Sequence, residues 1–288
     1  MQEVLLTFGD ELSFRLQGFP KELECKVCEF LSYHQSDSTN LASGQTLTIA
    51  HHEPAELSHL DATEVLVEPP LIVRENETQT IYEVPGALAW YDDARQKAGI
   101  SILDPENLAI EHLTRWVLIA LMFQLAMNRG WLGLHAAGIV TGGRAIVLPG
   151  PSGTGKTTIF TTAYEAGWEV LSDDLLWLRE TGLGFRAHGF VRSGDTVDPV
   201  AEPSADNIPI AAIVFPTISD EVGNRLVPVD SVEAIQLLAS QALWFGGKRT
   251  KARCFSAIVR LIRSNPCFTL LAGRNRQAVP ELLRTALP

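Results

Sequence analysis

The sequence predicts an α+β protein with a β-rich amino-terminal domain, residues 1–105, followed by an α/β domain, residues 106–288. In the first segment, short runs of β-forming residues are separated by Gly, Pro, Asn and Asp. From Gly133 onward, long apolar strands alternate with helical patterns. Charge divides the chain in the same way, with 18 acidic and 6 basic residues in the first segment and 16 and 17 in the second. This asymmetry indicates two units with different partners.

The amino-terminal domain is predicted to consist mostly of strands. The β-rich runs are VLLTF, TLTIAHH, EVLVE, LIVRE, TIYEV and ALAWY, and Pro69-Pro70 and residues 75–77 are predicted turns between neighbours. No catalytic constellation stands out here, because His51, His52 and His59 lack ligand-like companions. Cys25 and Cys28 form a single C-x-x-C without a second ligand pair, so we interpret them as two thiols on a short amphipathic stretch.

An apolar helix is predicted next, with Asp104 as its cap, Pro105 near its start and Gly130 at its end. Its core is apolar nearly all round, which predicts burial between layers. The run from 116 to 127 is shorter than the about 20 residues that a bilayer requires. No secretory signal precedes it, and a cytoplasmic protein without a membrane partner is expected. The overall charge of −11, without a basic stripe over most of the chain, argues against nucleic-acid binding.

The carboxy-terminal domain is predicted to alternate strands and helices. The expected strands are 133–140, 144–149, 169–178, 209–215 and a last one at CFTLLAG, and the expected helices are 156–166, 231–244, about 252–264 and 277–286.

A glycine-rich motif joins the second of these strands to the first of these helices. Residues 150–157 read GPSGTGKT and satisfy G-x-x-x-x-G-K-[ST], in the strand-to-helix context that the phosphate-binding loop requires. The glycines let backbone N–H groups converge on phosphate oxygens, and the helix presents its positive end to the same anion. Lys156 is expected to reach the β- and γ-phosphates, and Thr157 to offer a hydroxyl to Mg²⁺. The predicted nucleotide-binding residues are Gly150, Pro151, Ser152, Gly153, Thr154, Gly155, Lys156, Thr157 and Thr158.

A histidine is predicted to lie at the mouth of this loop. Gly142-Gly143 is a favoured two-residue hairpin turn, which makes the numbers of cross-strand partners sum to 285. His135 then lies opposite Gly150, where it can meet the γ-phosphate or a catalytic carboxylate.

Two adjacent aspartates, Asp173 and Asp174, follow the strand after the glycine-rich helix. That strand is expected beside the strand that precedes the loop, in a βαβ unit, with its carboxyl end facing the ligand crevice. An aspartate there can bind Mg²⁺ or accept a proton from an attacking hydroxyl. Because adjacent strand residues point to opposite faces, the two are expected to differ in role.

Residues 134–174 resemble the catalytic domain of HPr kinase/phosphorylase and its kinase-like relatives, some of them linked to peptide modification. That family shows a histidine, a hairpin, the glycine-rich loop, a helix and a strand ending in Asp-Asp, at the intervals found here. The resemblance implies a P-loop kinase domain at 106–288 that uses ATP and Mg²⁺. It implies that Asp173 is the base towards a serine hydroxyl and His135 its partner, and that Thr157 and Asp174 serve the metal.

The expected function is therefore transfer of the γ-phosphoryl group of ATP to a serine or similar hydroxyl of a peptide, protein or small molecule. Two rivals remain: a nucleotide-dependent switch or ATPase that acts on a partner without phosphorylating it, and a binding module that retains a nucleotide. The basic residue that contacts the triphosphate is open among Arg186, Arg192, Lys248 and Arg249, since the last two belong to a basic segment that equally suits a solvated face or a dock for the acidic half. A homo-oligomer is also left open.

Overall fold

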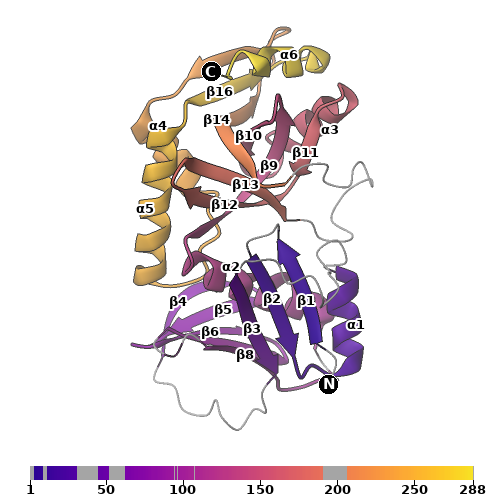
Figure 1. Cartoon of the computed structure of the whole chain (residues 1–288), viewed down its shortest axis with the longest axis vertical. Helices are drawn as coiled ribbons and strands as arrows, with labels where there is room; N and C mark the ends of the chain where they lie inside the picture. The colour runs from indigo at the N-terminus through magenta and orange to yellow at the C-terminus, as the bar shows by residue number, and fades with distance from the viewer. Residues whose placement is uncertain are drawn as a thin grey trace. The chain divides into compact units, whose positions relative to one another are not determined.

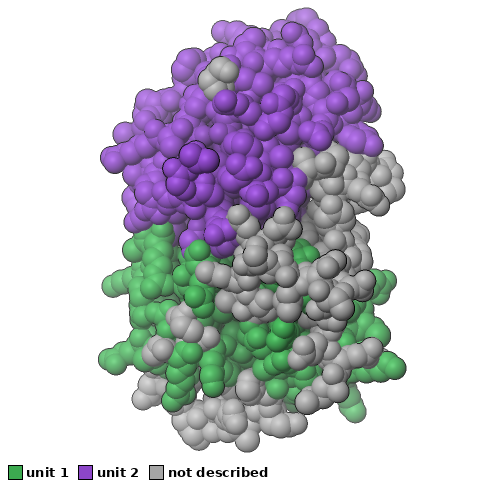
Figure 2. Space-filling view, in the orientation of Figure 1, with its two compact units in different colours: residues 1–129, 192–194, 244–253 green, residues 130–191, 195–243, 254–288 purple. Residues whose placement is uncertain are grey.

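The computed structural model describes residues 3–8, 12–30, 45–51, 62–93, 95, 97–106, 108–190 and 206–287. The fold is mixed α/β and contains two large β-sheets. The chain divides into two compact units (Figure 2). Unit 1 contains residues 1–129, 192–194 and 244–253, and unit 2 contains residues 130–191, 195–243 and 254–288. The predicted boundary between residues 105 and 106 therefore falls inside unit 1.

Unit 1 contains a sheet of eight described strands in the order β1-β2-β3-β8-β7-β6-β5-β4 (Figure 1). These are β1 (Glu3–Phe8), β2 (Leu12–Gln17), β3 (Gln45–His51), β4 (Thr63–Glu68), β5 (Leu71–Glu75), β6 (Gln79–Val84), β7 (Ala87–Asp92) and β8 (Lys97–Ile102). From β4 to β8 each strand pairs antiparallel with the next along the chain. Strand β3 joins this meander to β2 through two parallel pairings.

The six strands predicted for this unit are confirmed, and both predicted turns connect strands. Residues 69–70 turn between β4 and β5, and the Asn76 side chain accepts hydrogen bonds from the N–H groups of Thr78 (3.0 Å) and Gln79 (2.8 Å) in the β5–β6 turn. Such Asx turns are a recognised turn device. The prediction missed β2, β8 and helix α1 (Lys21–Phe30), which carries both thiols of the C-x-x-C.

The apolar helix of unit 1 is buried, as the sequence predicts. It consists of the π-helical η3 (His112–Leu118) and the α-helical α2 (Ile119–Met127), and all 9 residues of α2 are buried. No helix in the described part of the chain is long and apolar enough to cross a membrane.

The predicted start of this helix is wrong. Helical structure begins at Ile110, well after Asp104. The N–H groups of Leu103 (2.9 Å) and Asp104 (3.2 Å) both donate to the carbonyl of Gly86, in the β6–β7 turn. Residues 103–104 are thus bound to a neighbouring hairpin and do not cap the helix.

Unit 2 contains a second sheet, with the order β10-β9-β12-β13-β14-β16-β15 in its described part; β11 also pairs with β9, and β10 with β14. Its strands are β9 (Trp131–Thr141), β10 (Arg144–Pro149), β11 (Glu169–Ser172), β12 (Leu175–Thr181), β13 (Gly184–Phe190), β14 (Ile208–Ile218), β15 (Arg225–Pro228) and β16 (Cys267–Ala272). Its helices are α3 (Lys156–Glu165), α4 (Ser231–Ala239), η4 (Arg276–Ala278) and α6 (Val279–Arg284). Helix α5 (Lys248–Ser264) begins in unit 1 and continues into unit 2.

Three predictions for unit 2 need correction. The single strand expected at 169–178 is two strands, β11 and β12, separated by a bend at residues 173–174. Strand β11 pairs with β9 and not with β10, so the simple βαβ unit is not formed. Helix α4 ends at Ala239 rather than at 244, because the chain turns back there and the N–H of Leu243 donates to the carbonyl of Gly133 (2.9 Å). Strands β13 and β15 were not predicted.

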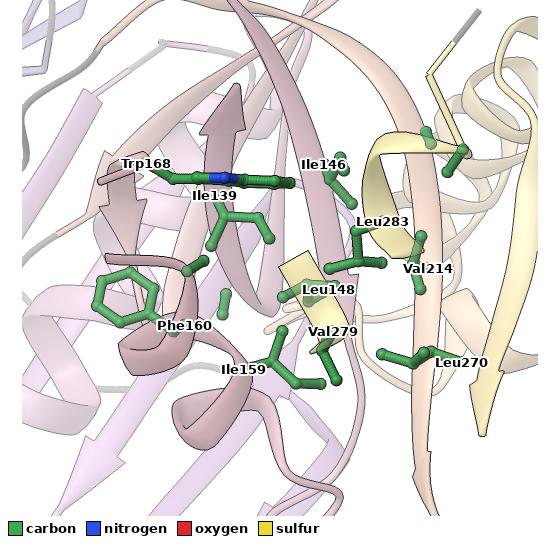
Figure 3. Packing of buried hydrophobic residues seen from close by; sticks show 14 of the residues in the cluster. Ile139, Ile146, Leu148, Ile159, Phe160, Trp168, Val214, Leu270, Val279 and Leu283 are labelled. Carbon is green, nitrogen blue, oxygen red and sulfur yellow. The ribbon is translucent and has the colours of Figure 1, made fainter. Parts of the chain in front are cut away.

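The core under the glycine-rich helix is made of side chains from several elements of unit 2 (Figure 3). Ile159 and Phe160 of α3 and Leu283 of α6 pack in one cluster with Leu148 of β10 and Trp168. These side chains are at most 7% exposed. The packing holds α3 against the sheet and so fixes the position at which the loop before it ends.

Replacing Leu283 by alanine is expected to lower the free energy of unfolding by about 2–5 kcal/mol, the range for deleting a buried leucine side chain. Leu283 is 0% exposed in this cluster. Its neighbour Leu282 is only partly buried against the same cluster, so Leu282→Ala is a matched control with an expected loss of about 1 kcal/mol. Urea unfolding of both variants measures the difference, and equal losses would contradict the packing described here.

Candidate functional site

The glycine-rich loop, residues Gly150–Gly155, connects β10 to α3. Gly153 (φ 85°) and Gly155 (φ 95°) adopt left-handed backbone conformations that side chains disfavour, and Gly155 caps α3. A Cβ at position 150 would lie 2.8 Å from the hydroxyl of Thr154. That hydroxyl donates to the carbonyl of Pro151 (2.9 Å), which tightens the loop on itself. The loop therefore closes on itself directly before the first turn of α3, whose N–H groups have no partners within the helix.

Lys156, the first residue of α3, points back over this loop. Its side chain is buried, and its Nζ donates to the carbonyls of Gly150 and Pro151, the latter at 3.0 Å. Burial lowers the pKa of the Lys156 ammonium below its ordinary value, while the carboxylates of Asp174 and Asp173 oppose this shift. Both carboxylates are thus close enough to act on the ammonium through their charge.

The hairpin before the loop has the predicted register. Gly142 (φ 58°) and Gly143 (φ 70°) form the turn, and the strand partners run from Arg144 opposite Thr141 to Pro149 opposite Ala136, all summing to 285. One further step along β9 reaches His135, at the end of the hairpin where the loop begins. The N–H of His135 donates to the carbonyl of Gln241 (2.8 Å), which fixes the backbone there.

The two aspartates occupy the bend between β11 and β12. The buried hydroxyl of Ser172 donates to the carbonyl of Phe190 (3.1 Å) and accepts from the N–H of Asp174 at 3.4 Å. The carbonyl of Asp174 accepts a hydrogen bond from the N–H of Ala136 (2.9 Å). These contacts tie the bend to β9 at the residue next to His135.

His135 and Asp174 form the central contact of the site. The Nε2 atom of His135 lies 3.1 Å from Oδ1 of Asp174, and both side chains are about one-third exposed. The resemblance implies that His135 is the partner of Asp173, whereas the imidazole contact that the structure gives is with Asp174. Both aspartates lie in a bend, so the strand alternation expected over residues 169–178 does not run through them.

The strand pairing explains why these groups meet. Strands β10 and β11 both run antiparallel to β9, one on each side of it, so their carboxyl ends lie at the same edge of the sheet. The glycine-rich loop follows β10 and the aspartates follow β11, while His135 lies on β9 between them. The carboxyl ends of β10 and β11 therefore lie at one edge of the sheet, as predicted, although β9 was not predicted to lie between these two strands.

The oxygen atoms near the loop suit a hard cation but do not enclose one. Within the described ranges, no group of three or more His, Cys, Asp or Glu side chains is placed to hold a metal ion. The Thr157 hydroxyl is on an exposed residue at the start of α3, and the Asp173 and Asp174 carboxylates are partly exposed. Mg²⁺ commonly binds one or two protein oxygens and takes its other ligands from phosphates and water. The residues present fit that mode of binding.

Two of the four basic residues considered for the triphosphate, Arg186 and Arg249, have other partners. The guanidinium of Arg186 binds the side-chain oxygen (2.6 Å) and the carbonyl of Asn207. Arg249 binds the carboxylate of Asp93 (2.7 Å) and the carbonyl of Glu77 (2.7 Å), all within unit 1. Lys248 is exposed in unit 1, and Arg192 lies outside the described residues. The basic segment was expected to contact the triphosphate, to form a solvated face or to dock against the acidic half. The structure shows that Arg249 contacts Glu77 and Asp93, which belong to the acidic half.

Sequence reasoning missed two supporting residues, Ser172 and Gln241. Ser172 stands directly before the aspartates, and small polar residues at chain reversals often bond nearby backbone groups, so its position was a usable signal. Gln241 contributes only its carbonyl, and no sequence pattern identifies such a contact.

Fold and site together define a class: a mixed α/β protein in which a strand, a glycine-rich loop and a helix lie beside an imidazole–carboxylate pair. A model of the family described as SynChlorMet cassette protein ScmC matches residues 100–284. The match covers well over half of the chain and every site residue discussed above, so the chain belongs to this family. No curated protein matches the sequence closely enough to count as a relative.

Proposed function

We propose that this protein is an ATP-dependent kinase that transfers the γ-phosphoryl group to a serine or similar hydroxyl. The observation that carries the proposal is the gathering of Lys156, the glycine-rich loop and the His135–Asp174 pair at one edge of the sheet in unit 2. Phosphoryl transfer depends chiefly on positioning and charge neutralisation, and these groups supply both.

The glycine-rich loop is proposed to hold the phosphates. Backbone N–H groups of the loop and of the first turn of α3 are available to phosphate oxygens, and the helix end adds a favourable dipole. The ammonium of Lys156 now bonds to loop carbonyls. Exchanging them for phosphate oxygens would give this buried cation stronger, charge-assisted partners.

Mg²⁺ is proposed to bind at the Thr157 hydroxyl and a carboxylate of the 173–174 pair. When bound, the ion supplies neutralisation of phosphate charge. The protein's own part is to present oxygen ligands beside Lys156, whose ammonium acts on the same anion.

Asp174 is proposed as the base that accepts the proton of the attacking hydroxyl, a role that the resemblance gives to Asp173. Three observations favour Asp174: its contact with His135, its larger effect on Lys156, and its backbone bond to β9. Positioned acids and bases of this kind contribute about 10²–10⁴-fold to a rate. His135 orients the carboxylate through the 3.1 Å contact and is a positioning residue in this scheme.

The acceptor is proposed to be a hydroxyl on a peptide or protein. The support is the resemblance of residues 134–174 to HPr kinase/phosphorylase and its relatives, some of them linked to peptide modification. Unit 1 is then the proposed element that selects the acceptor.

The test is an assay with γ-labelled ATP and Mg²⁺ on serine-containing peptides and purified proteins, with label on the acceptor as the readout. Label on a serine hydroxyl that depends on Lys156 supports the proposal. Steady release of phosphate without any labelled acceptor would instead identify a nucleotide-dependent switch or ATPase.

Arg249→Ala is expected to leave the rate of label transfer within about twofold of wild type, because Arg249 already binds Asp93 and Glu77 in unit 1. The expected cost in unfolding free energy is no more than about 1 kcal/mol, the usual worth of an exposed ion pair. The same labelling assay and urea unfolding measure both effects. A loss of transfer of a hundredfold would assign Arg249 to the triphosphate after all.

A further inference from the structure

A pocket of about 50 Å³ adjoins the glycine-rich loop in unit 2. Its walls include Gly155, the cap of α3, Thr158 and Thr162 of α3, Ile218 at the end of β14, and Gly273 and Arg276 after β16. Its floor is apolar, since Ile159 and Val279 of the core also line it and are 4% and 1% exposed. The pocket is smaller than the about 300–1,000 Å³ of a site that encloses a whole ligand, but its apolar floor with a few polar groups at the rim is the lining that such sites share.

The strand order places this pocket and the aspartates on opposite sides of the loop. Strand β14 runs parallel to β10, and β16 parallel to β14, so the carboxyl ends of all three lie at one edge of the sheet. On the other side of β10 come β9, which carries His135, and then β11, which leads to the aspartates. With neighbouring strands about 4.8 Å apart, β9 and β14 are separated by roughly 10 Å across β10.

The far wall of the pocket is held in place by hydrogen bonds. The N–H of Gly273 donates to the side chain of Asn224 (2.8 Å), whose amide donates to the carbonyl of Asn275 (2.6 Å), and the N–H of Ser219 donates to the carbonyl of Ala272 (2.8 Å). A Cβ at position 273 would lie 2.3 Å from the carbonyl oxygen of Gly223. This close packing indicates that the pocket is formed before any ligand binds.

The exposed apolar side chain of Ile218 is the feature of the pocket that indicates a ligand. Its side chain is 62% exposed, although it lies at the pocket wall and 3.8 Å from where a Cβ on Gly155 would be. A flat apolar group entering the pocket would cover Ile218 and gain the free energy of removing apolar surface from water. Arg276 also lines the pocket, and an arginine side chain carries several hydrogen-bond donors.

We propose that this pocket binds the nucleoside end, base and ribose, of the nucleotide whose phosphates occupy the glycine-rich loop. The inference rests on the proposed function and gives the nucleotide a direction. The base packs against Ile218, the phosphates pass over the loop, and the γ-phosphate points to the His135–Asp174 pair.

Calorimetric titration of the full chain with ATP and with inorganic tripolyphosphate, both with Mg²⁺, tests this inference. Wild type is expected to bind ATP more tightly than tripolyphosphate. Ile218→Ala is expected to weaken ATP binding about tenfold, since tenfold corresponds to about 1.4 kcal/mol and a buried isoleucine contact supplies that much. The affinity for tripolyphosphate should stay unchanged in this variant.

Val222→Ala is the matched control, because Val222 is an aliphatic residue, 75% exposed, in the neighbouring segment and does not line the pocket. It should leave both affinities unchanged. Arg276→Ala is a second pocket variant, expected to weaken ATP more than tripolyphosphate.

The outcomes separate the two proposals. A wild-type protein that binds neither ligand contradicts the proposed function itself. A wild-type protein that binds both ligands, with ATP affinity unaltered by Ile218→Ala and Arg276→Ala, leaves the proposed function standing and overturns the nucleoside pocket.

Discussion

Asp174→Asn is expected to lower the rate of γ-phosphoryl transfer by about 10²–10⁴-fold, the contribution of a positioned general base. Asparagine has the same shape as aspartate but cannot take the proton of the attacking hydroxyl. Because Lys156 and the glycine-rich loop are unchanged, the affinity for ATP should change far less than the rate. Single-turnover transfer of labelled phosphate at saturating ATP, with nucleotide affinity from calorimetry, measures the two effects separately.

Asp173→Asn is the matched control for this experiment, since it removes the same charge one residue away in the same bend. The carboxylate of Asp173 acts on Lys156 less than that of Asp174 does, and the imidazole contact belongs to Asp174. A loss of less than about tenfold is expected. The reverse order of the two losses would return the base to Asp173, and two unaffected variants would remove carboxylate catalysis from the mechanism.

Lys156→Ala is expected to reduce the rate of phosphoryl transfer by about 10²–10³-fold. This is the usual effect of removing one group that stabilises the charge developing in a transition state. Both ATP and tripolyphosphate should also bind more weakly, because the ammonium is the proposed partner of the phosphates in either ligand. Lys21→Ala is the control, because Lys21 is an exposed lysine of unit 1 that was not a candidate for the triphosphate. Transfer by Lys21→Ala should stay within about twofold of wild type; equal losses in the two variants would contradict the role given to Lys156.

The same lysine variant has a distinct expected effect on stability. The folded state holds the pKa of Lys156 below its ordinary value, because burial disfavours the charged form. Between the lowered pKa and the ordinary one, the folded protein binds fewer protons than the unfolded chain, so this group makes the unfolding free energy rise as pH increases. Lys156→Ala lacks that contribution. Urea unfolding at neutral and alkaline pH should therefore show a smaller alkaline gain for Lys156→Ala than for wild type.

Much of the local structure follows from patterns within the sequence. The Gly142-Gly143 turn set the register of the β9–β10 hairpin, since a two-residue turn leaves one pairing for the flanking strands. The left-handed glycines 153 and 155 lie where the motif requires them. The all-round apolar pattern of α2 likewise predicted a buried helix, because only burial on every side stabilises such a surface.

The start of the long helix could not be predicted from the residues next to it in the sequence. Asp104 and Pro105 form a reasonable cap by local rules, but the carbonyl of Gly86 takes the N–H groups of residues 103 and 104. A hydrogen bond to a carbonyl of another hairpin is about as strong as one to a local capping group. No residue pattern indicates which of the two forms.

Residue patterns alone predict the glycine-rich loop, the register of the β9–β10 hairpin next to it and an aspartate pair after the following strand. The pairing of β11 with β9, the bend at residues 173–174 and the contact of Asp174 with the imidazole are visible only in the folded unit. They could not be predicted locally because every strand edge offers the same N–H and carbonyl groups. The choice between edges is therefore made by packing and chain connection across the whole unit, not by the strand's own residues.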